Sequence, residues 1–251
     1  MIRALAVGGF LLAAVPGVAR AQTPARAEAP LESARALIAR FHEDPADIDR
    51  ARDLLEDAVQ RDPQPGGLTL LSRVYFLYGD LRARTEADKL AAYDRGRELG
   101  KRAVEQLPEN PDAHLWYAIN AGRWAQTKGV LRSLRLLPTM REEVETLLRL
   151  NPRSPETQSL AGSFFAEVPR LLGGDPARAE GHFKTGLQLD PHMTGIRLQL
   201  ASFYLAAGRT AEARRELLRV LEEQAPKDLP RWTVMEVPLA RKYLETIAQE
   251  K

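Results

Sequence analysis

One residue spacing recurs along this chain and constrains its fold more than any other feature. A small or apolar residue is followed by similar residues four and seven positions later. In most copies a proline follows twelve positions after the first residue. Positions 0, 4 and 7 lie on one face of an α-helix, where small or apolar side chains let a neighbouring helix pack closely. The proline cannot continue the helix, so the chain turns there. The copies are Ala51, Leu55, Ala58, Pro63; Gly96, Gly100, Ala103, Pro108; Met140, Val144, Leu147, Pro152; Ala179, Phe183, Gly186, Pro191; and Ala213, Leu217, Val220, with the last proline one residue late at Pro226.

The fourth copy has the clearest boundaries. An apolar helix pattern runs from Glu156 to Val168 and stops at two glycines. Asp175 then has the character of an N-cap, and Pro176 stands at the first helical position, where its missing N–H group costs nothing. The stretch from Pro155 to Pro191 is therefore predicted to be one helical hairpin.

Repeated hairpins with this spacing resemble the tetratricopeptide repeat, whose second helix has small, aromatic, small and proline positions at these intervals. Successive prolines are 45, 44, 39 and 35 residues apart, and only the last distance approaches the usual period of about 34. The extra residues of the second and third units are predicted to lie between their helices, around Leu81–Lys89 and Lys128–Pro138. Insertions in such places usually form loops on one face of a solenoid, and this is often the binding face.

These features predict an all-α fold, a right-handed solenoid of about five tetratricopeptide-like hairpins. The repeat domain is expected over residues 31–226, and a linker with a C-terminal capping helix over residues 227–251. Solenoids need an atypical terminal element of this kind. The apolar residues of this helix that are available to cover the last repeat are Val234, Leu239, Tyr243, Leu244 and Ile247.

The N-terminus has the pattern of a secretory signal peptide over Met1–Ala21. Arg3 supplies the basic region, Ala4–Val18 the apolar region, and Ala19–Ala21 a small-x-small cleavage site. Glycines and a proline interrupt the apolar region, whereas a membrane anchor needs about 20 apolar residues, so cleavage is favoured. Residues 22–30 are predicted to be a disordered polar tether.

The charge balance and the absence of cysteine limit the classes of partner and the cellular location that the sequence predicts. The chain has 36 basic and 34 acidic residues, and two of the basic ones, Arg3 and Arg20, lie in the signal peptide. The mature chain is therefore close to neutral, which argues against a nucleic-acid partner. There is no cysteine, hence neither a disulfide nor a lipid-anchor cysteine after the signal. A soluble periplasmic protein is expected, and its oligomeric state is left open.

No known catalytic motif is present. The sequence lacks a cysteine nucleophile, a G-x-S-x-G motif, a Walker A loop and a dinucleotide fingerprint. The four histidines do not have the spacing of a metal site. We therefore expect neither an enzyme nor a bound metal or cofactor. The histidines are His42, His114, His182 and His192.

The richest candidate binding surface lies on the helix predicted from Asn110 or Pro111 to about Thr127. It carries two of the three tryptophans, with an amide and two cations on the same segment. Aromatic rings with a few oriented polar groups are typical of ligand sites. The alternative is that Trp116 and Tyr117 pack in the core and Arg123 is solvated. The candidate residues here are Trp116, Asn120, Arg123, Trp124 and Lys128.

A second candidate surface surrounds Pro169. A proline within a helical pattern kinks or ends the helix and releases a backbone carbonyl group. Arg170 next to it could bind a carboxylate, with Phe164 nearby. An equally good alternative is a kink that only fits the repeat to its neighbour.

Two segments carry a more specific resemblance, HLWYAINAGRWAQTKG and FFAEVPRLLGGDPARAEGHFKTGLQLDP. Together with the repeats over Ala51–Ala225, they resemble the exported proteins of the T-component (TatT-like) family of tripartite ATP-independent periplasmic (TRAP) transporters. The resemblance implies a periplasmic helical protein with a pore or cleft for an apolar ligand and a substrate-binding protein as partner. Members are often lipoproteins, and this chain lacks the cysteine for that. The eukaryotic regulators of microtubule dynamics share a similar helical pattern, but export argues against their role.

Two functions are compatible with the sequence. The first is a protein–protein interaction scaffold, the commonest use of repeat solenoids. The second is a TRAP-transporter accessory that encloses a small apolar or carboxylate ligand. A closed apolar cavity would favour the second function, and an open charged groove the first. We take the scaffold as the prediction and the accessory as the alternative.

Overall fold

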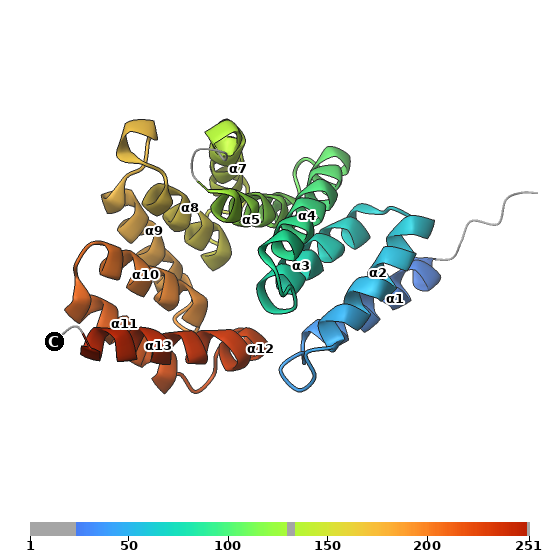
Figure 1. Cartoon of the computed structure of the whole chain (residues 1–251). Helices are drawn as coiled ribbons and strands as arrows, with labels where there is room; N and C mark the ends of the chain where they lie inside the picture. The colour runs from blue at the N-terminus through green and yellow to red at the C-terminus, as the bar shows by residue number, and fades with distance from the viewer. Residues whose placement is uncertain (1–23, 130–133, 250–251) are drawn as a thin grey trace, which may run out of the picture.

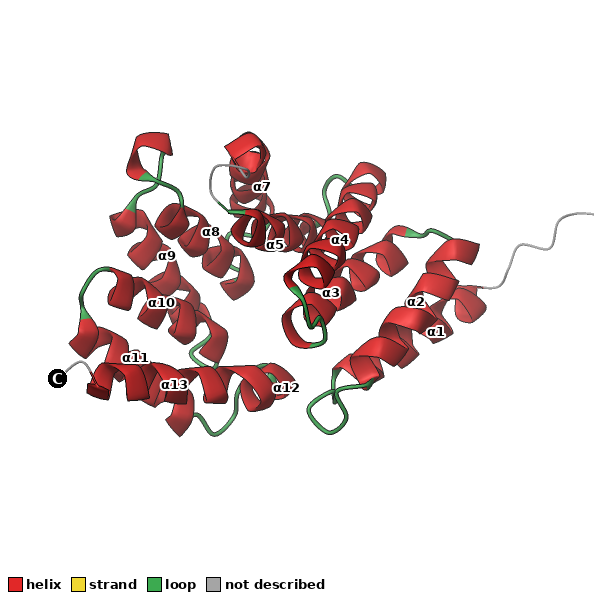
Figure 2. Ribbon diagram, in the orientation of Figure 1, coloured by secondary structure: helices red, strands yellow, loops and turns green. Residues whose placement is uncertain are grey.

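The described part of the chain is built from helical hairpins that stack side by side into a curved solenoid (Figure 1). The computed structural model describes residues 24–129 and 134–249, and within these ranges every regular element is helical. Short loops join the helices (Figure 2). The hairpins are α1 (Pro24–Ile38) with α2 (Asp47–Arg61), α3 (Pro65–Leu81) with α4 (Glu86–Gln106), α5 (Pro111–Lys128) with α7 (Leu137–Leu150), α8 (Pro155–Glu167) with α9 (Pro176–Leu189), and α10 (Thr194–Ala206) with α11 (Thr210–Glu222). A C-terminal segment follows, made of α12 (Leu229–Arg231), a π-helix (Trp232–Glu236) and α13 (Val237–Gln249).

The recurring spacing marks the second helix of every hairpin, as predicted. The residues at offsets 0, 4 and 7 lie on α2, α4, α7, α9 and α11, and all except Ala58 are buried. Ala58 is half-buried, and the next residue, Val59, is buried in its place. The all-α solenoid class predicted from the sequence is thus confirmed.

Several helix starts follow directly from capping chemistry. The Asn110 side chain accepts hydrogen bonds from the backbone N–H groups of the second and third residues of α5, at 2.9 and 3.2 Å. Asp175 does the same for α9, at 2.9 and 3.1 Å. Thr85 and Asp88 form a reciprocal capping box at the start of α4. Each side chain satisfies N–H groups that have no partner within the helix, so these residues fix the register of three repeats.

Two boundaries differ from the sequence-based expectation. In the second hairpin only residues 82–85 separate the helices, because the extra residues lengthen α3 to 17 and α4 to 21 residues instead of forming an inserted loop. In the third hairpin the insertion does separate α5 from α7, and it includes a short 3₁₀ turn, Leu134–Leu136. At the N-terminus α1 begins at Pro24, within the segment expected to be a tether. The predicted signal peptide lies outside the described residues.

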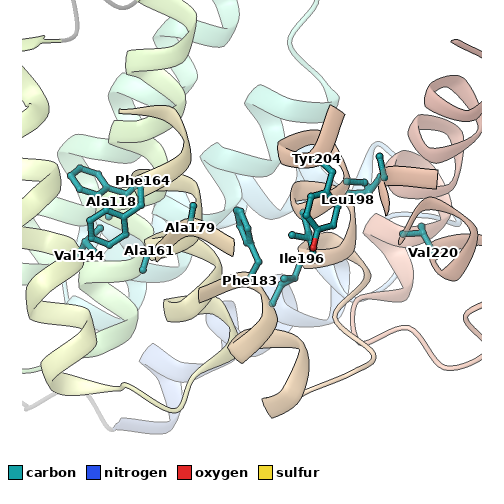
Figure 3. Packing of buried hydrophobic residues seen from close by; sticks show 14 of the residues in the cluster. Ala118, Val144, Ala161, Phe164, Ala179, Phe183, Ile196, Leu198, Tyr204 and Val220 are labelled. Carbon is teal, nitrogen blue, oxygen red and sulfur yellow. The ribbon is translucent and has the colours of Figure 1, made fainter. Parts of the chain in front are cut away.

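The hydrophobic core consists of two clusters that meet at α5. The N-terminal cluster contains side chains from α1 to α5, and the C-terminal cluster extends from α5 to α13. Figure 3 shows the C-terminal cluster, where Phe164 lies beside Val144 and Ala118, and Phe183 lies between Ala179 and Ile196. No described helix combines the length and the apolar character needed to cross a bilayer.

The C-terminal segment contacts both clusters. Leu239, Tyr243, Leu244 and Ile247 pack on the C-terminal cluster, as expected of a cap, whereas Val234 packs against the N-terminal cluster. In Figure 1, α12 lies at the end of α13 that points toward the N-terminal hairpins. The segment therefore links the last repeat to the N-terminal cluster, which the sequence did not predict.

Candidate functional site

The solenoid encloses a half-open cleft of about 1770 Å³. Its walls come mainly from the first helices of successive hairpins, α3, α5, α8 and α10, and from the C-terminal segment. Large apolar side chains line much of these walls, so the cleft offers an extensive apolar surface to a partner. They include Phe76, Trp116, Ile119, Phe164, Phe203 and Tyr243.

Three of the seven predicted binding residues line this cleft. Trp116 packs against Phe76 with ring centroids 5.7 Å apart. Arg123 donates a hydrogen bond from Nη2 to Oδ2 of Asp80 at 3.1 Å, and so it is held by an ion pair as well as exposed to the cleft. Phe164 is 6% exposed and belongs both to the core and to the cleft wall. The structure therefore brings together residues from both predicted surfaces.

Asn120 occupies a structural position. It is fully buried, and its Nδ2 donates to the backbone oxygen of Ser72 at 3.0 Å and to that of Trp116 at 2.9 Å. Ser72 in turn donates from Oγ to the carbonyl oxygen of Gly96 at 2.7 Å. Asn120 thus connects α3, α4 and α5, and it has no surface left for a ligand.

The other predicted residues lie away from the cleft lining. The Arg97 guanidinium and the Lys128 ammonium lie 5.7 and 5.6 Å from the centroid of the Trp124 ring, which faces α4. Arg170 is exposed at the start of a 3₁₀ turn, Arg170–Leu172, and Pro169 ends α8 as predicted. A role for Trp124, Lys128 or Arg170 in binding remains a prediction.

Two arginines that line the cleft, Arg73 and Arg231, were not among the predicted binding residues. The Arg73 guanidinium lies 5.4 Å from the Trp116 ring, and the Arg231 guanidinium lies 5.0 Å from the Phe76 ring. Arg123 lies 5.6 Å from the same Phe76 ring. Three cations therefore surround two aromatic rings. A signal for Arg73 was present, because it is the only charged residue in the apolar run between Gly67 and Gly79.

These three arginines differ in their partners. Arg123 and Arg231 share the carboxylate of Asp80, at 3.1 and 3.7 Å, and the hydroxyl of Tyr93 donates to the same carboxylate at 2.8 Å. Burial is the main cause that raises the pKa of Tyr93. Arg73 forms no ion pair with any residue that the structure describes, and its buried Nε has no hydrogen-bond partner there. Burial lowers the pKa of Arg73, although Asp228 acts in the opposite direction.

Three of the four histidines, His114, His182 and His192, make side-chain hydrogen bonds, whereas the buried Nδ1 of His42 has no partner among the described residues. His114 is buried between α5 and α7, with Nδ1 2.6 Å from Glu143 Oε2 and Nε2 2.8 Å from the Pro108 carbonyl oxygen. Burial raises the pKa of Glu143. Within residues 24–129 and 134–249, no group of three or more metal-ligating side chains comes together.

Stacked hairpins around an inner cleft define a helical repeat protein of the tetratricopeptide type. A tetratricopeptide-repeat family model matches residues 171–233. The crystal structure of a thermophilic TPR protein from Thermus thermophilus superimposes with a TM-score of 0.65 and 25% sequence identity. The superposition covers 86% of this chain and 100% of that one.

Within this class, the family model "Regulator of microtubule dynamics protein 1-3" matches residues 32–172, more than half of the chain. The chain belongs to this family. It is 25% identical to regulator of microtubule dynamics protein 3 of Bos taurus over 170 residues, and 31% identical to protein 2 of Mus musculus over 101 residues. These matches cover 61% and 40% of this chain but only 36% and 24% of the relatives. The finer resemblance to the TRAP T component is not confirmed by them and remains a prediction.

Proposed function

We propose that this chain is a non-catalytic interaction scaffold that holds a segment of a partner protein in its inner cleft. The observation that supports this proposal is the cleft itself. Its volume of about 1770 Å³ exceeds the range of about 300–1,000 Å³ that is typical of small-molecule sites. The cleft is half-open and follows several repeats, so an extended polypeptide can enter it without unfolding the solenoid. Repeat solenoids commonly bind partners on such concave surfaces.

Site-specific photo-crosslinking tests this proposal. A photoreactive residue is placed at Ser202, an exposed position of α10 that lines the cleft, and a matched one at Gln188, an exposed position of α9 outside the cleft lining. We expect an adduct with another polypeptide from position 202 and none from position 188. Equal labelling from both positions, or no protein adduct from a folded variant, would contradict the scaffold function.

The second candidate is the carriage of a small organic ligand, the role that the resemblance to the TRAP T component implies. The apolar rings of the cleft wall favour it, because they could cover an apolar ligand beside the cationic side chains. Native mass spectrometry of protein purified without refolding separates the two functions. A reproducible small mass excess that is lost on denaturation would support carriage, and clean protein masses would support the scaffold.

We further propose that the chain is exported and that its partner is periplasmic, such as a substrate-binding protein. The signal pattern over Met1–Ala21 supports this proposal. The relatives are named for microtubule dynamics, but an exported chain would not meet microtubules. We therefore transfer only the helical-repeat fold, and not the function, from these relatives to this chain. The intact mass of the protein recovered from a periplasmic fraction tests export, and it should correspond to Gln22–Lys251.

A further inference from the structure

Arg73 is the one cation of the Phe76–Trp116 cluster without a partner in the described structure. Arg123 and Arg231 lie over the Phe76 ring, but both form ion pairs with Asp80, and Arg231 also lies 3.9 Å from a Glu236 oxygen. Arg73 is half-buried, and its buried Nε has no acceptor among the described residues. A buried N–H group without an acceptor loses its hydration and gains no hydrogen bond in return. Proteins usually avoid this cost, so the position calls for an acceptor from outside the described chain.

Arg73 is also accessible from the cleft. It lines the cleft wall together with Phe76 and Trp116, and its guanidinium stacks over the Trp116 ring. An arriving group would therefore meet a cation that is already oriented, next to apolar rings. A guanidinium pairs best with a planar oxyanion, because its fork of N–H groups matches two oxygens.

The surrounding charges select the kind of anion. Asp228, Asp112 and Glu156 all act on Arg73 as nearby negative charges, and Arg231 is the nearby positive charge. These carboxylates would repel a dianionic phosphate more strongly than the single charge of a carboxylate. The apolar rings on either side favour an aliphatic or aromatic neighbour for that carboxylate.

We propose that Arg73 is the anchor of the cleft for one acidic side chain of the partner segment, with apolar residues of that segment packing on Phe76 and Trp116. This inference rests on the scaffold function and specifies the chemistry of the partner. The carboxylate binds the part of the Arg73 guanidinium that faces the cleft and so sets the register of the bound segment.

The test is a selection from a random library of displayed 12-residue peptides on the purified chain and on three variants. Arg73→Gln removes the charge, and Arg73→Lys keeps the charge but loses the planar fork. The matched control is Arg153→Gln, because Arg153 also lines the cleft without an ion pair among the described residues but is exposed. Circular dichroism melting of each variant confirms folding. Arg73→Gln should melt at or above the wild-type temperature, since it removes a half-buried charge that has no ion pair among the described residues.

We expect the wild-type chain to select peptides with Asp or Glu next to Leu, Phe or Trp. For a selected peptide, Arg73→Gln should weaken binding about tenfold to a hundredfold, the range for a hydrogen-bonded ion pair. Arg73→Lys should restore part of this affinity, and Arg153→Gln should leave it unchanged. Trp116 fluorescence provides the titration signal.

The outcomes distinguish the two levels of the proposal. If no peptide is selected above a bait-free control, the scaffold function itself is contradicted. If peptides are selected without an acidic preference, or if their affinity survives Arg73→Gln, the anchor is wrong while the scaffold stands. An equal loss in Arg153→Gln would show that any cation of the cleft attracts the peptide and would also overturn the anchor.

Discussion

The second and the fourth hairpins use the same spacing to make two different kinds of contact. In α4 the positions are Gly96, Gly100 and Ala103, and α5 comes so close that a Cβ atom on Gly100 would lie 2.7 Å from the backbone Cα of Tyr117. In α9 the middle position is instead Phe183, which is 1% exposed. There the glycine is on the other helix, because a Cβ atom on Gly162 of α8 would lie 2.7 Å from the Phe183 ring.

This difference shows that the spacing specifies a close contact and not a residue type. Where α4 of the second hairpin meets α5 of the third, small residues allow backbone to approach backbone, and a buried amide, Asn120 of α5, completes the junction by hydrogen bonds. In the fourth hairpin a large ring fills the space that a glycine leaves. The first junction depends on exact backbone distance, the second on volume, and the following substitutions test this distinction.

The largest effect is expected from Phe183→Ala in the fourth hairpin. Removal of a fully buried ring leaves a cavity, and we expect the free energy of unfolding to fall by about 3–5 kcal/mol. Urea unfolding followed by circular dichroism measures this loss. The control Phe183→Leu should lose clearly less, because it keeps most of the volume. Equal losses for Ala and Leu would show that the ring shape, and not volume, matters.

Gly100→Ala should be strongly damaging for a single-methyl change. The new methyl group meets backbone atoms, which cannot rotate away, so we expect a loss of about 3 kcal/mol, the upper end for overpacking. The matched control is Gly181→Ala in α9, where nothing lies within 4 Å of the added Cβ. That substitution should raise the stability by up to about 1 kcal/mol through helix propensity. If both substitutions change the melting temperature by the same amount and in the same direction, α4 and α5 do not approach each other as closely as described.

Asn120→Ala tests the polar part of the first junction. It leaves the Ser72 carbonyl oxygen without its 3.0 Å donor in a buried position, and we expect a loss of about 2 kcal/mol. The double variant with Arg123→Ala should lose at least as much, since Arg123 is paired with Asp80. Stability close to wild type in a chemical unfolding experiment would instead return Asn120 to the candidates for binding.

The smallest effect concerns the pH dependence of the fourth hairpin. Hydrogen bonds from Arg209, with those from Lys184 and Tyr204, lower the pKa of Glu180 to about 2 from its ordinary 4.5. Because the folded pKa is the lower one, this contribution to stability is complete above about pH 4.5 and is lost as the pH falls toward 2.

Glu180→Gln does not titrate, so its stability should fall less steeply than that of the wild-type chain over this range. Unfolding free energies at several pH values between 5 and 2 give the two slopes. Glu222→Gln, a change at an exposed glutamate of α11, serves as control and should keep the wild-type slope. Parallel curves for the wild-type chain and Glu180→Gln would exclude the ion pair as a source of acid sensitivity.

Predictions of local structure succeeded where one helical turn contains all the information. Asn110 and Asp175 cap their helices because their side chains reach N–H groups two and three residues away. The lengthened α3 and α4 were missed because proline spacing counts residues without showing whether they form helix or loop. The candidate site was predicted in part. Trp116, Arg123 and Phe164 reach the cleft, but periodicity alone could not show that Asn120 points into the junction with Ser72.

The sequence by itself determined the repeat, because offsets 0, 4 and 7 and the closing prolines act within one helix and one turn. The tertiary structure alone decided how the repeats enclose a cleft and which charges remain there. Asp80 and Arg231 are far apart in the chain and meet only because the C-terminal segment reaches back to the N-terminal hairpins. Arg73 lacks a partner for the same reason, since the pairing of a buried charge depends on every element that folds around it.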